Sequence, residues 1–362
     1  MPRYFQGLLF ALIVTALNLP ALPAFAQSTP RQLAPEQLAP EQLAQAELHE
    51  LTVQLPGGPS LRYAGLLLAV ERGYFTSAGI DLVLRGHIPE EAPVAAVADG
   101  NADLAIDILP SALRARAETA DVVHVAQIFQ RATLSLVCRP DVDQPGKLAG
   151  ENIGVWMGGW ESSFYAWLNR LGLSYFASGG GVTVLRQSLD AEMFLAGEVD
   201  CMTTTSYQAP LQLAPMGDQQ AALVTYSYED LGLGVLEDGL YARGGDLADP
   251  ARIDLFARFL AALGRGWQAA AADPAAATKM LAALPENEGI DPAVLRRALG
   301  AVNAALAVQK DGLVGQLDPA AYDRSVNLLL TGAPEPVLTA APDAAISDLV
   351  FRQRRQLGRF NN

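Results

Sequence analysis

The chain has 362 residues, of which 51% are hydrophobic and 18% are charged. Its 39 acidic and 25 basic residues give a formal charge of −14, which argues against nucleic acid or an anionic membrane as a partner. The three histidines are scattered and show no metal-ligand spacing, so we expect no metal and no cofactor.

Residues 1–26 have the order of features found in a secretory signal peptide. Arg3 precedes an apolar run over residues 8–19, and a small-residue signature follows at residues 24–26. The run is too short to span a bilayer, and charges, glycines or prolines interrupt every later one. We therefore expect export to the periplasm and no membrane insertion once the signal is cleaved.

Residues 27–48 are of low complexity and contain a five-residue repeat with prolines. Prolines at this spacing stop a helix from propagating, and the segment has few apolar groups to bury. We interpret it as a linker.

Beyond the linker, apolar runs alternate with helical patterns, which predicts a largely parallel sheet built from βα units. The expected strands cover residues 51–55, 80–84, 104–108, 122–129, 134–138, the stretch from 152 to Trp156, 182–185, 201–205 and 223–226. The expected helices cover residues 62–71, 94–99, 111–118, 162–171, 191–196, 253–272, 274–284 and 292–308. This order predicts two α/β lobes, with a helical tail that returns to the first.

The most informative stretch joins the strand at Trp156 to a helix from Ser162 through a glycine pair. Gly158 and Gly159 permit positive φ and a close approach of a ligand to the backbone. Because ligands of α/β sheets bind at the carboxyl ends of strands, Trp156 and Trp160 are candidates for stacking on a planar molecule. Glu161 is then a candidate acceptor for its edge. The alternative is that Trp156 belongs to the core and Glu161 only complements the helix dipole.

Two further candidates follow buried strands. Tyr63 comes after the first strand, where it is either a ligand contact or a helix-surface aromatic. Asp107 ends an apolar strand, where an unpaired carboxylate would be costly, so we expect a ligand or hinge role. Cys138 and Cys201 form one disulfide in an oxidising compartment, or remain two buried thiols.

Seven blocks of the chain carry a resemblance to a known family. They cover residues 63–82, 100–107, 126–131, 148–156, 197–200, 237–241 and 258–275. In this order they resemble the thiamine-pyrimidine-synthase-like class of periplasmic solute-binding proteins, which serve ABC importers. The class includes receptors for pyrimidine thiamine precursors, alkanesulfonates, taurine and nitrate.

The resemblance implies a type II periplasmic binding protein fold, an α/β structure whose two lobes close on a solute. The first lobe would comprise residues 49–131 and 239–355, and the second residues 132–238. Such a protein works as a monomer with an ABC permease and an ATPase. The glycine turn is most similar to the branch that binds pyrimidine-type precursors, with riboflavin-binding relatives close to it. Trp160 departs from this branch, which often has Asn there.

On this fold, further side chains are expected at the cleft. Gln130 lies at the first crossover between the lobes. Glu237 and Asp238 lie at the second, and we expect one of these two acids to have a structural role and not to contact the ligand. Thr204 and Tyr207 follow the strand 201–205 and are expected to face the same cleft.

We therefore expect a receptor for a planar nitrogen heterocycle, such as hydroxymethyl- or formylamino-pyrimidine. Riboflavin or a small anion is the alternative, although Arg131 and Arg186 are the only arginines expected near the cleft. An exported enzyme is a third reading. Against it, the sequence has no Gly-x-Ser-x-Gly elbow, no cysteine–histidine constellation and no metal-ligand spacing, so we expect no enzyme activity.

Overall fold

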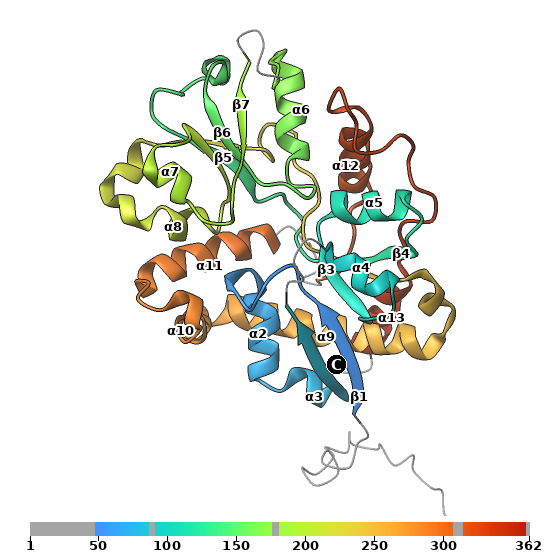
Figure 1. Ribbon diagram of the computed structural model, residues 1–362. Helices are drawn as coiled ribbons and strands as arrows, with labels where there is room; N and C mark the ends of the chain where they lie inside the picture. The colour runs from blue at the N-terminus through green and yellow to red at the C-terminus, as the bar shows by residue number, and fades with distance from the viewer. Residues whose placement is uncertain (1–47, 87–90, 176–180, 307–313, 360–362) are drawn as a thin grey trace, which may run out of the picture. The chain divides into compact units, whose positions relative to one another are not determined.

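Two five-stranded sheets form the framework of the computed structural model, which describes residues 48–86, 91–175, 181–306 and 314–359 (Figure 1). The predicted signal peptide and nearly all of the linker lie outside the described residues. The first sheet has the strand order β2-β1-β3-β10-β4, and its strands are β1 (His49–Gln54), β2 (Ile80–Arg85), β3 (Leu104–Asp107), β4 (Val122–Gln127) and β10 (Gly239–Arg243). The second has the order β7-β6-β8-β5-β9, with β5 (Leu134–Cys138), β6 (Asn152–Val155), β7 (Thr183–Arg186), β8 (Cys201–Thr205) and β9 (Val224–Ser227).

The prediction of largely parallel sheets is wrong, because both sheets are mixed. Strand β1 is parallel to β2 and β3, but β10 is antiparallel to β3 and β4. Likewise β6 is parallel to β7 and β8, but β5 is antiparallel to β8 and β9. Strands β5 and β10 are each the first strand after the chain changes sheet. Each of them runs antiparallel to both of its neighbours, and the hydrophobic pattern of a strand does not indicate the direction in which it enters a sheet.

Helices follow most strands, and the eight helices expected from the sequence are present with ends within three residues. They are α2 (Ala64–Glu71), α4 (Pro93–Ala98), α5 (Leu109–Ala117), α6 (Ser162–Leu171), α7 (Glu192–Ala196), α9 (Pro250–Ala272), α10 (Pro274–Ala282) and α11 (Pro292–Leu306). The sequence reading missed α3 (Tyr74–Ser77), α8 (Ala209–Gln212), α12 (Pro319–Thr331) and α13 (Leu349–Arg359). Proline begins α9, α10 and α12, and the preceding aspartate accepts a backbone N–H as the cap. No helix among the described ranges has both the length and the apolar character needed to cross a bilayer.

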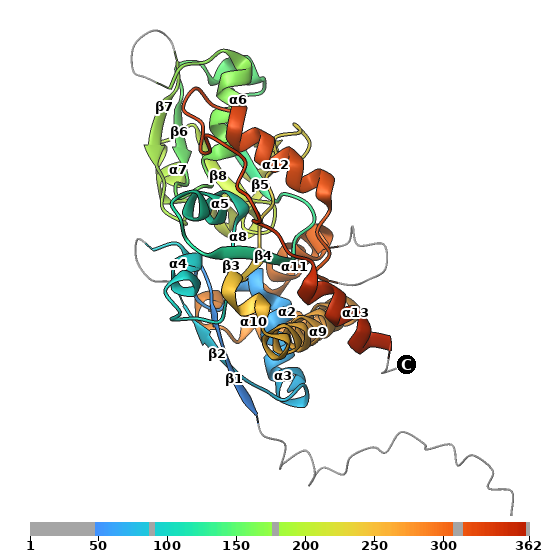
Figure 2. The same ribbon diagram turned by 90° about the vertical axis from the view of Figure 1, so that its right-hand side faces the viewer.

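The helical tail contacts helices that belong to both sheets. Val326 and Leu329 of α12 pack in one apolar cluster with Leu109 and Leu113 of α5, which follows β3. Figure 2 shows α12 also lying beside α6, which follows β6. The tail therefore does not return to the first sheet alone, as the sequence suggested, because α12 braces both halves.

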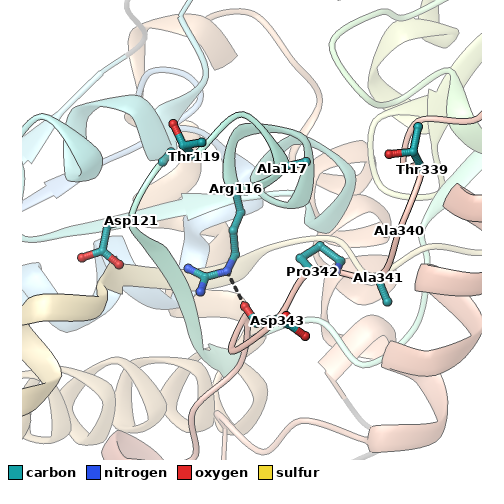
Figure 3. A pocket seen from close by; sticks show the side chains of 10 residues that line it. Arg116, Ala117, Thr119, Asp121, Thr339, Ala340, Ala341, Pro342 and Asp343 are labelled. Atoms are coloured by element: carbon teal, nitrogen blue, oxygen red, sulfur yellow. Dashed lines mark hydrogen bonds between the residues drawn. The ribbon is translucent and has the colours of Figure 1, made fainter.

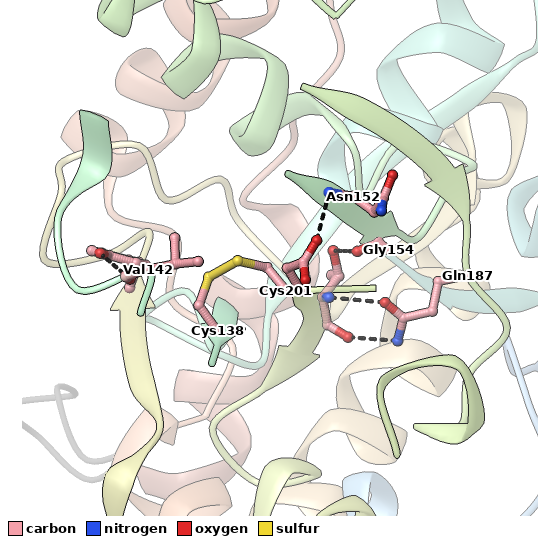
Figure 4. Close-up of a disulfide and its surroundings, with 9 residues drawn as sticks. Cys138, Val142, Asn152, Gly154, Gln187 and Cys201 are labelled. Carbon is pink, nitrogen blue, oxygen red and sulfur yellow. Dashed lines mark hydrogen bonds between the residues drawn. A yellow bond between two sulfur atoms is a disulfide. The ribbon is translucent and has the colours of Figure 1, made fainter. Parts of the chain in front are cut away.

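Cys138 and Cys201 are joined in a disulfide, so the alternative of two free thiols is excluded (Figure 4). The two residues are paired on the neighbouring strands β5 and β8, and both are fully buried. Beside them, the amide of Gln187 exchanges two hydrogen bonds of 2.9 Å with the backbone of Thr203. The disulfide thus links β5 to β8, and the Gln187 side chain makes with β8 the pair of hydrogen bonds that a neighbouring strand would make.

Candidate functional site

A pocket of about 570 Å³ lies at the carboxyl ends of strands from both sheets. Its lining includes residues 60–62, which follow β1, residues 189–190, which follow β7, and residues 207–208, which follow β8. Leu211 and Gln212 of α8 and residues 286–287 complete it. Carboxyl ends of strands are where α/β proteins bind ligands, so this pocket is the candidate site.

Arg62 forms the innermost polar contact of this pocket. Its Nε donates to both carboxylate oxygens of Asp238, at 2.8 and 2.9 Å, and its Nη2 also donates to Asp238. The guanidinium carbon lies 5.3 Å from the ring centroid of Trp160, within cation–π range. Burial alone would lower the pKa of Arg62, but Asp238 and the rings of Tyr63 and Tyr207 raise it well above its usual value, so the guanidinium stays charged.

The remaining charges of the pocket are acidic. Asp190 and Glu286 line it and are exposed, whereas Arg62, the one cation among the described lining residues, is neutralised by Asp238. Within the described part of the chain, a bound anion would meet two carboxylates and no free cation of the lining. The pocket is therefore electrostatically suited to a neutral or cationic ligand.

Tyr63 and Tyr207 lie next to Arg62 and are both buried. The hydroxyl of Tyr63 has no hydrogen-bond partner among the described residues, although burial of such a group normally requires one. Burial raises the pKa of both phenols beyond the physiological range, so both hydroxyls remain protonated. Tyr63 thus has a buried hydroxyl that no described residue uses, although Tyr63 itself is not part of the pocket lining.

Neither Trp156 nor Trp160 belongs to the lining of this pocket, but Trp160 contacts Arg62, which does. Trp156 is only 3% exposed, and its indole N–H donates to the carbonyl of Ser188 at 2.9 Å. The two indoles meet edge to face with centroids 5.8 Å apart. Trp156 therefore packs against Trp160 as a buried residue, which agrees with the alternative that Trp156 belongs to the core.

The glycine turn contacts α5. Gly158 and Gly159 both have positive φ, as expected. Glu161 accepts the N–H of Gly159 at 2.7 Å and pairs with Arg114 of α5 at 3.3 Å. It is thus engaged in holding the turn and in contacting the helix after β3.

Alanine at the two glycines is expected to have unequal effects. At Gly159 (φ 110°) a Cβ would lie 3.2 Å from Ile108 Cδ1 and from the backbone nitrogen of Ser111, whereas at Gly158 (φ 83°) it would meet nothing within 4 Å. Gly158→Ala should cost about 1 kcal/mol from the left-handed backbone, and Gly159→Ala about 3 kcal/mol because overpacking is added. Urea unfolding of the two variants measures this; equal losses would contradict the proposed contact with α5.

Four sequence candidates lie outside the pocket or are engaged elsewhere. Asp107 accepts hydrogen bonds from the backbone of Ile108 and the hydroxyl of Ser111, at 2.7 and 3.0 Å, and so ties the end of β3 to the first turn of α5. Burial raises its pKa to about 6. Gln130 donates to the carbonyl of Gln316 at 2.8 Å. These contacts account for Asp107 and Gln130 as structural groups.

Thr204 and Glu237 are also held by protein contacts. Thr204 donates to Gln212 and lines a different pocket from Tyr207, so the two do not share one cavity. Glu237 is buried and accepts the N–H groups of Thr133 and Leu134 at 2.7 and 2.9 Å. It joins the two segments that cross between the sheets. The sequence reading missed Arg62, although its place directly before Tyr63 after the first strand was a usable signal.

A second cavity, of about 420 Å³, is lined by residues 116–117, 119–121 and 339–343 (Figure 3). Arg116 uses its guanidinium to bind the carbonyls of Asp343 and Val122, at 2.9 and 2.8 Å. Its charge therefore fixes the C-terminal segment against the turn before β4. This cavity lies away from the strand ends that line the candidate site.

The chain passes from the first sheet to the second after β4 and returns to the first after β9, and a pocket lies at strand ends of both sheets. This arrangement defines the type II periplasmic binding protein fold. The chain belongs to the NMT1/THI5-like family, which it matches over residues 60–277. The family resemblance predicted from the seven sequence blocks is thus confirmed.

Individual relatives are more distant. The formylaminopyrimidine-binding protein of Halalkalibacterium halodurans is 28% identical over 109 residues, which are 30% of this chain and 33% of that protein, so the match spans a third of that relative's length. The alkanesulfonate-binding protein SsuA from Xanthomonas axonopodis pv. citri, solved with MOPS, is 19% identical with a TM-score of 0.61 over 83% of this chain and 99% of its own. The desulfurization enzyme DSZB is 17% identical with a TM-score of 0.51 over 85% and 99%. The fold therefore occurs in binding proteins and in an enzyme.

Proposed function

We propose that the protein is the solute-binding component of an ABC importer and captures a small planar nitrogen heterocycle. The ligand class is a thiamine pyrimidine precursor such as hydroxymethyl- or formylamino-pyrimidine. Membership of the NMT1/THI5-like family supports this proposal, as does the relative that binds formylaminopyrimidine. A permease and an ATPase would receive the ligand, and the protein would act in the periplasm after loss of residues 1–26.

The observation that carries the proposal is the composition of the pocket at the strand ends. Arg62, Asp190 and Glu286 line it, and the ring of Trp160 lies 5.3 Å from the guanidinium carbon of Arg62. A flat heteroaromatic ring gains from stacking on an indole, and its amino groups need acceptors. We assign the stacking role to Trp160, with Trp156 supporting it, and the polar contacts to Tyr63 and Tyr207.

Closure of two lobes would bury the ligand in this pocket. We propose residues 49–131 and 239–355 as one lobe and residues 132–238 as the other, with the bonds of Glu237 to Thr133 at the hinge. The glycine turn would transmit closure to α5 through Gly159. Such hinge motions are typical of periplasmic binding proteins.

A small anion is the less favoured ligand. Arg131 is half exposed and lies 3.5 Å from Glu229, and Arg186 is exposed at the end of β7. Neither lines the pocket, and Arg62 is already paired with Asp238. An alkanesulfonate or nitrate would therefore have no unpaired guanidinium there.

A thermal-shift screen of the mature chain tests the ligand class. The panel contains hydroxymethyl- and formylamino-pyrimidine, thiamine, riboflavin, taurine, an alkanesulfonate and nitrate. A ligand at 100 times its Kd stabilises the folded state by about 2.7 kcal/mol, so we expect Tm to rise on the order of 5 °C with a pyrimidine. A rise with only the anions would overturn the ligand assignment.

A further inference from the structure

We infer that Arg62 occupies the place of the ligand: its guanidinium fills a slot between Trp160 and Asp238 that a planar amidinium group of the ligand takes over on binding. This inference rests on the proposed function and deepens it, because it names the group of the ligand that the protein recognises. The ligand would be an aromatic amidine, in which a protonated ring nitrogen stands next to an exocyclic amino group.

The geometry of the slot is that of amidinium recognition. Arg62 directs Nε and Nη2 at the carboxylate of Asp238, with Nε 2.8 and 2.9 Å from its two oxygens. The same cation lies 5.3 Å from the centroid of the Trp160 ring. A carboxylate that accepts two neighbouring N–H donors, with an aromatic ring near the cation, can bind a flat cationic group with two N–H donors on one edge. A protonated aminopyrimidine has this edge.

The slot borders the pocket through Arg62, and its carboxylate is shielded from solvent. The Arg62 side chain is 14% exposed and lines the pocket, whereas the Asp238 side chain is only 3% exposed. A carboxylate so buried needs a cationic partner, because leaving it alone costs several kcal/mol. Whatever displaces Arg62 must therefore carry a matching positive charge, which selects amidinium ligands over neutral isosteres.

Two further features fit an exchange of partners. Asp190 and Glu286 line the same pocket as Arg62, so a displaced guanidinium would meet carboxylates there and the exchange would conserve charge. The Tyr63 hydroxyl, buried and without a partner among the described residues, is an electrostatic neighbour of Arg62 and Asp238. It provides a free acceptor for an N–H of the ligand that the guanidinium does not use.

Chemical complementation of Arg62→Ala tests the inference. The probe is benzamidine, a planar aromatic amidinium, and the control probe is benzamide, its neutral isostere. Isothermal titration of the mature chain measures both affinities. The Kd of benzamidine should be at least tenfold lower for Arg62→Ala than for the wild type. For Arg62→Ala, the Kd of benzamidine should also be at least tenfold lower than that of benzamide. Adding Asp238→Asn to this variant should weaken benzamidine at least tenfold.

Equal benzamidine affinity for wild type and Arg62→Ala, or equal affinity of the two probes for the variant, would overturn the inference. Should Arg62→Ala not fold, Arg62→Gln leaves an uncharged side chain that still donates to Asp238, and the same differences are expected. The proposed function is tested separately by the pyrimidine screen on wild type. If that screen is negative while Arg62→Ala gains benzamidine, the proposed function fails and the amidinium slot stands.

Discussion

Replacing both Cys138 and Cys201 by alanine should lower the free energy of unfolding by about 4 kcal/mol. The disulfide joins residues 63 positions apart, and this loop includes β6, β7 and the glycine turn. Cross-linking a loop of that length removes much of the conformational freedom of the unfolded chain. Both cysteines are buried on paired strands, so alanine leaves no unpaired polar group in their place.

Urea unfolding of the double variant, with and without a reductant, measures the contribution. The wild type with reductant should approach the double variant, whereas the double variant should not respond to reductant. A loss below about 1 kcal/mol would mean that the bridge does not constrain the unfolded chain as assumed. The single variant Cys201→Ala is the control and should be as unstable as the double variant.

The fold was predicted well where the information is local. The helix α6 has its predicted bounds, and the prolines that begin α9 and α10 were visible in the chain. The antiparallel direction of β5 and β10 relative to their neighbours was not predicted. Hydrophobic periodicity indicates which face of a strand is buried, but it does not indicate which strands lie beside it. Strand β10 was not predicted at all.

The site was predicted in part, and the errors have physical causes. Sequence reasoning assigned the stacking to Trp156 at the glycine turn. In the structure Trp156 is buried and its indole N–H donates to the carbonyl of Ser188, 32 positions away, a contact that no local pattern indicates. Arg62 and Asp238 are 176 positions apart, so no local pattern indicates that they form an ion pair.

Glu237 is expected to make stability depend on pH near neutrality. Burial raises its pKa from 4.5 to about 7, against the opposing effect of its hydrogen bonds from Thr133 and Leu134. A carboxyl group with a raised pKa binds more protons in the folded state. Its stabilising contribution is therefore complete below pH 4.5 and is lost as the pH rises through 7, by up to about 3 kcal/mol. Asp107, whose pKa is raised to about 6, shifts stability in the same direction.

Two variants of Glu237 separate its charge from its hydrogen bonds. The N–H groups of Thr133 and Leu134 both donate to Oε1, and glutamine keeps that oxygen. The Thr133 hydroxyl donates to Oε2, and the amide N–H of glutamine would donate to that hydroxyl instead. Glu237→Gln should therefore match the wild type at pH 5, exceed its stability at pH 8 and flatten the pH profile of urea unfolding. Glu237→Ala leaves both buried N–H groups without an acceptor and should cost about 4 kcal/mol at pH 5. If Glu237→Gln instead kept the slope of the wild type between pH 5 and 8, the titrating group would be another one. A loss in Glu237→Ala no larger than that in Glu237→Gln would show that the two crossover segments do not depend on this side chain.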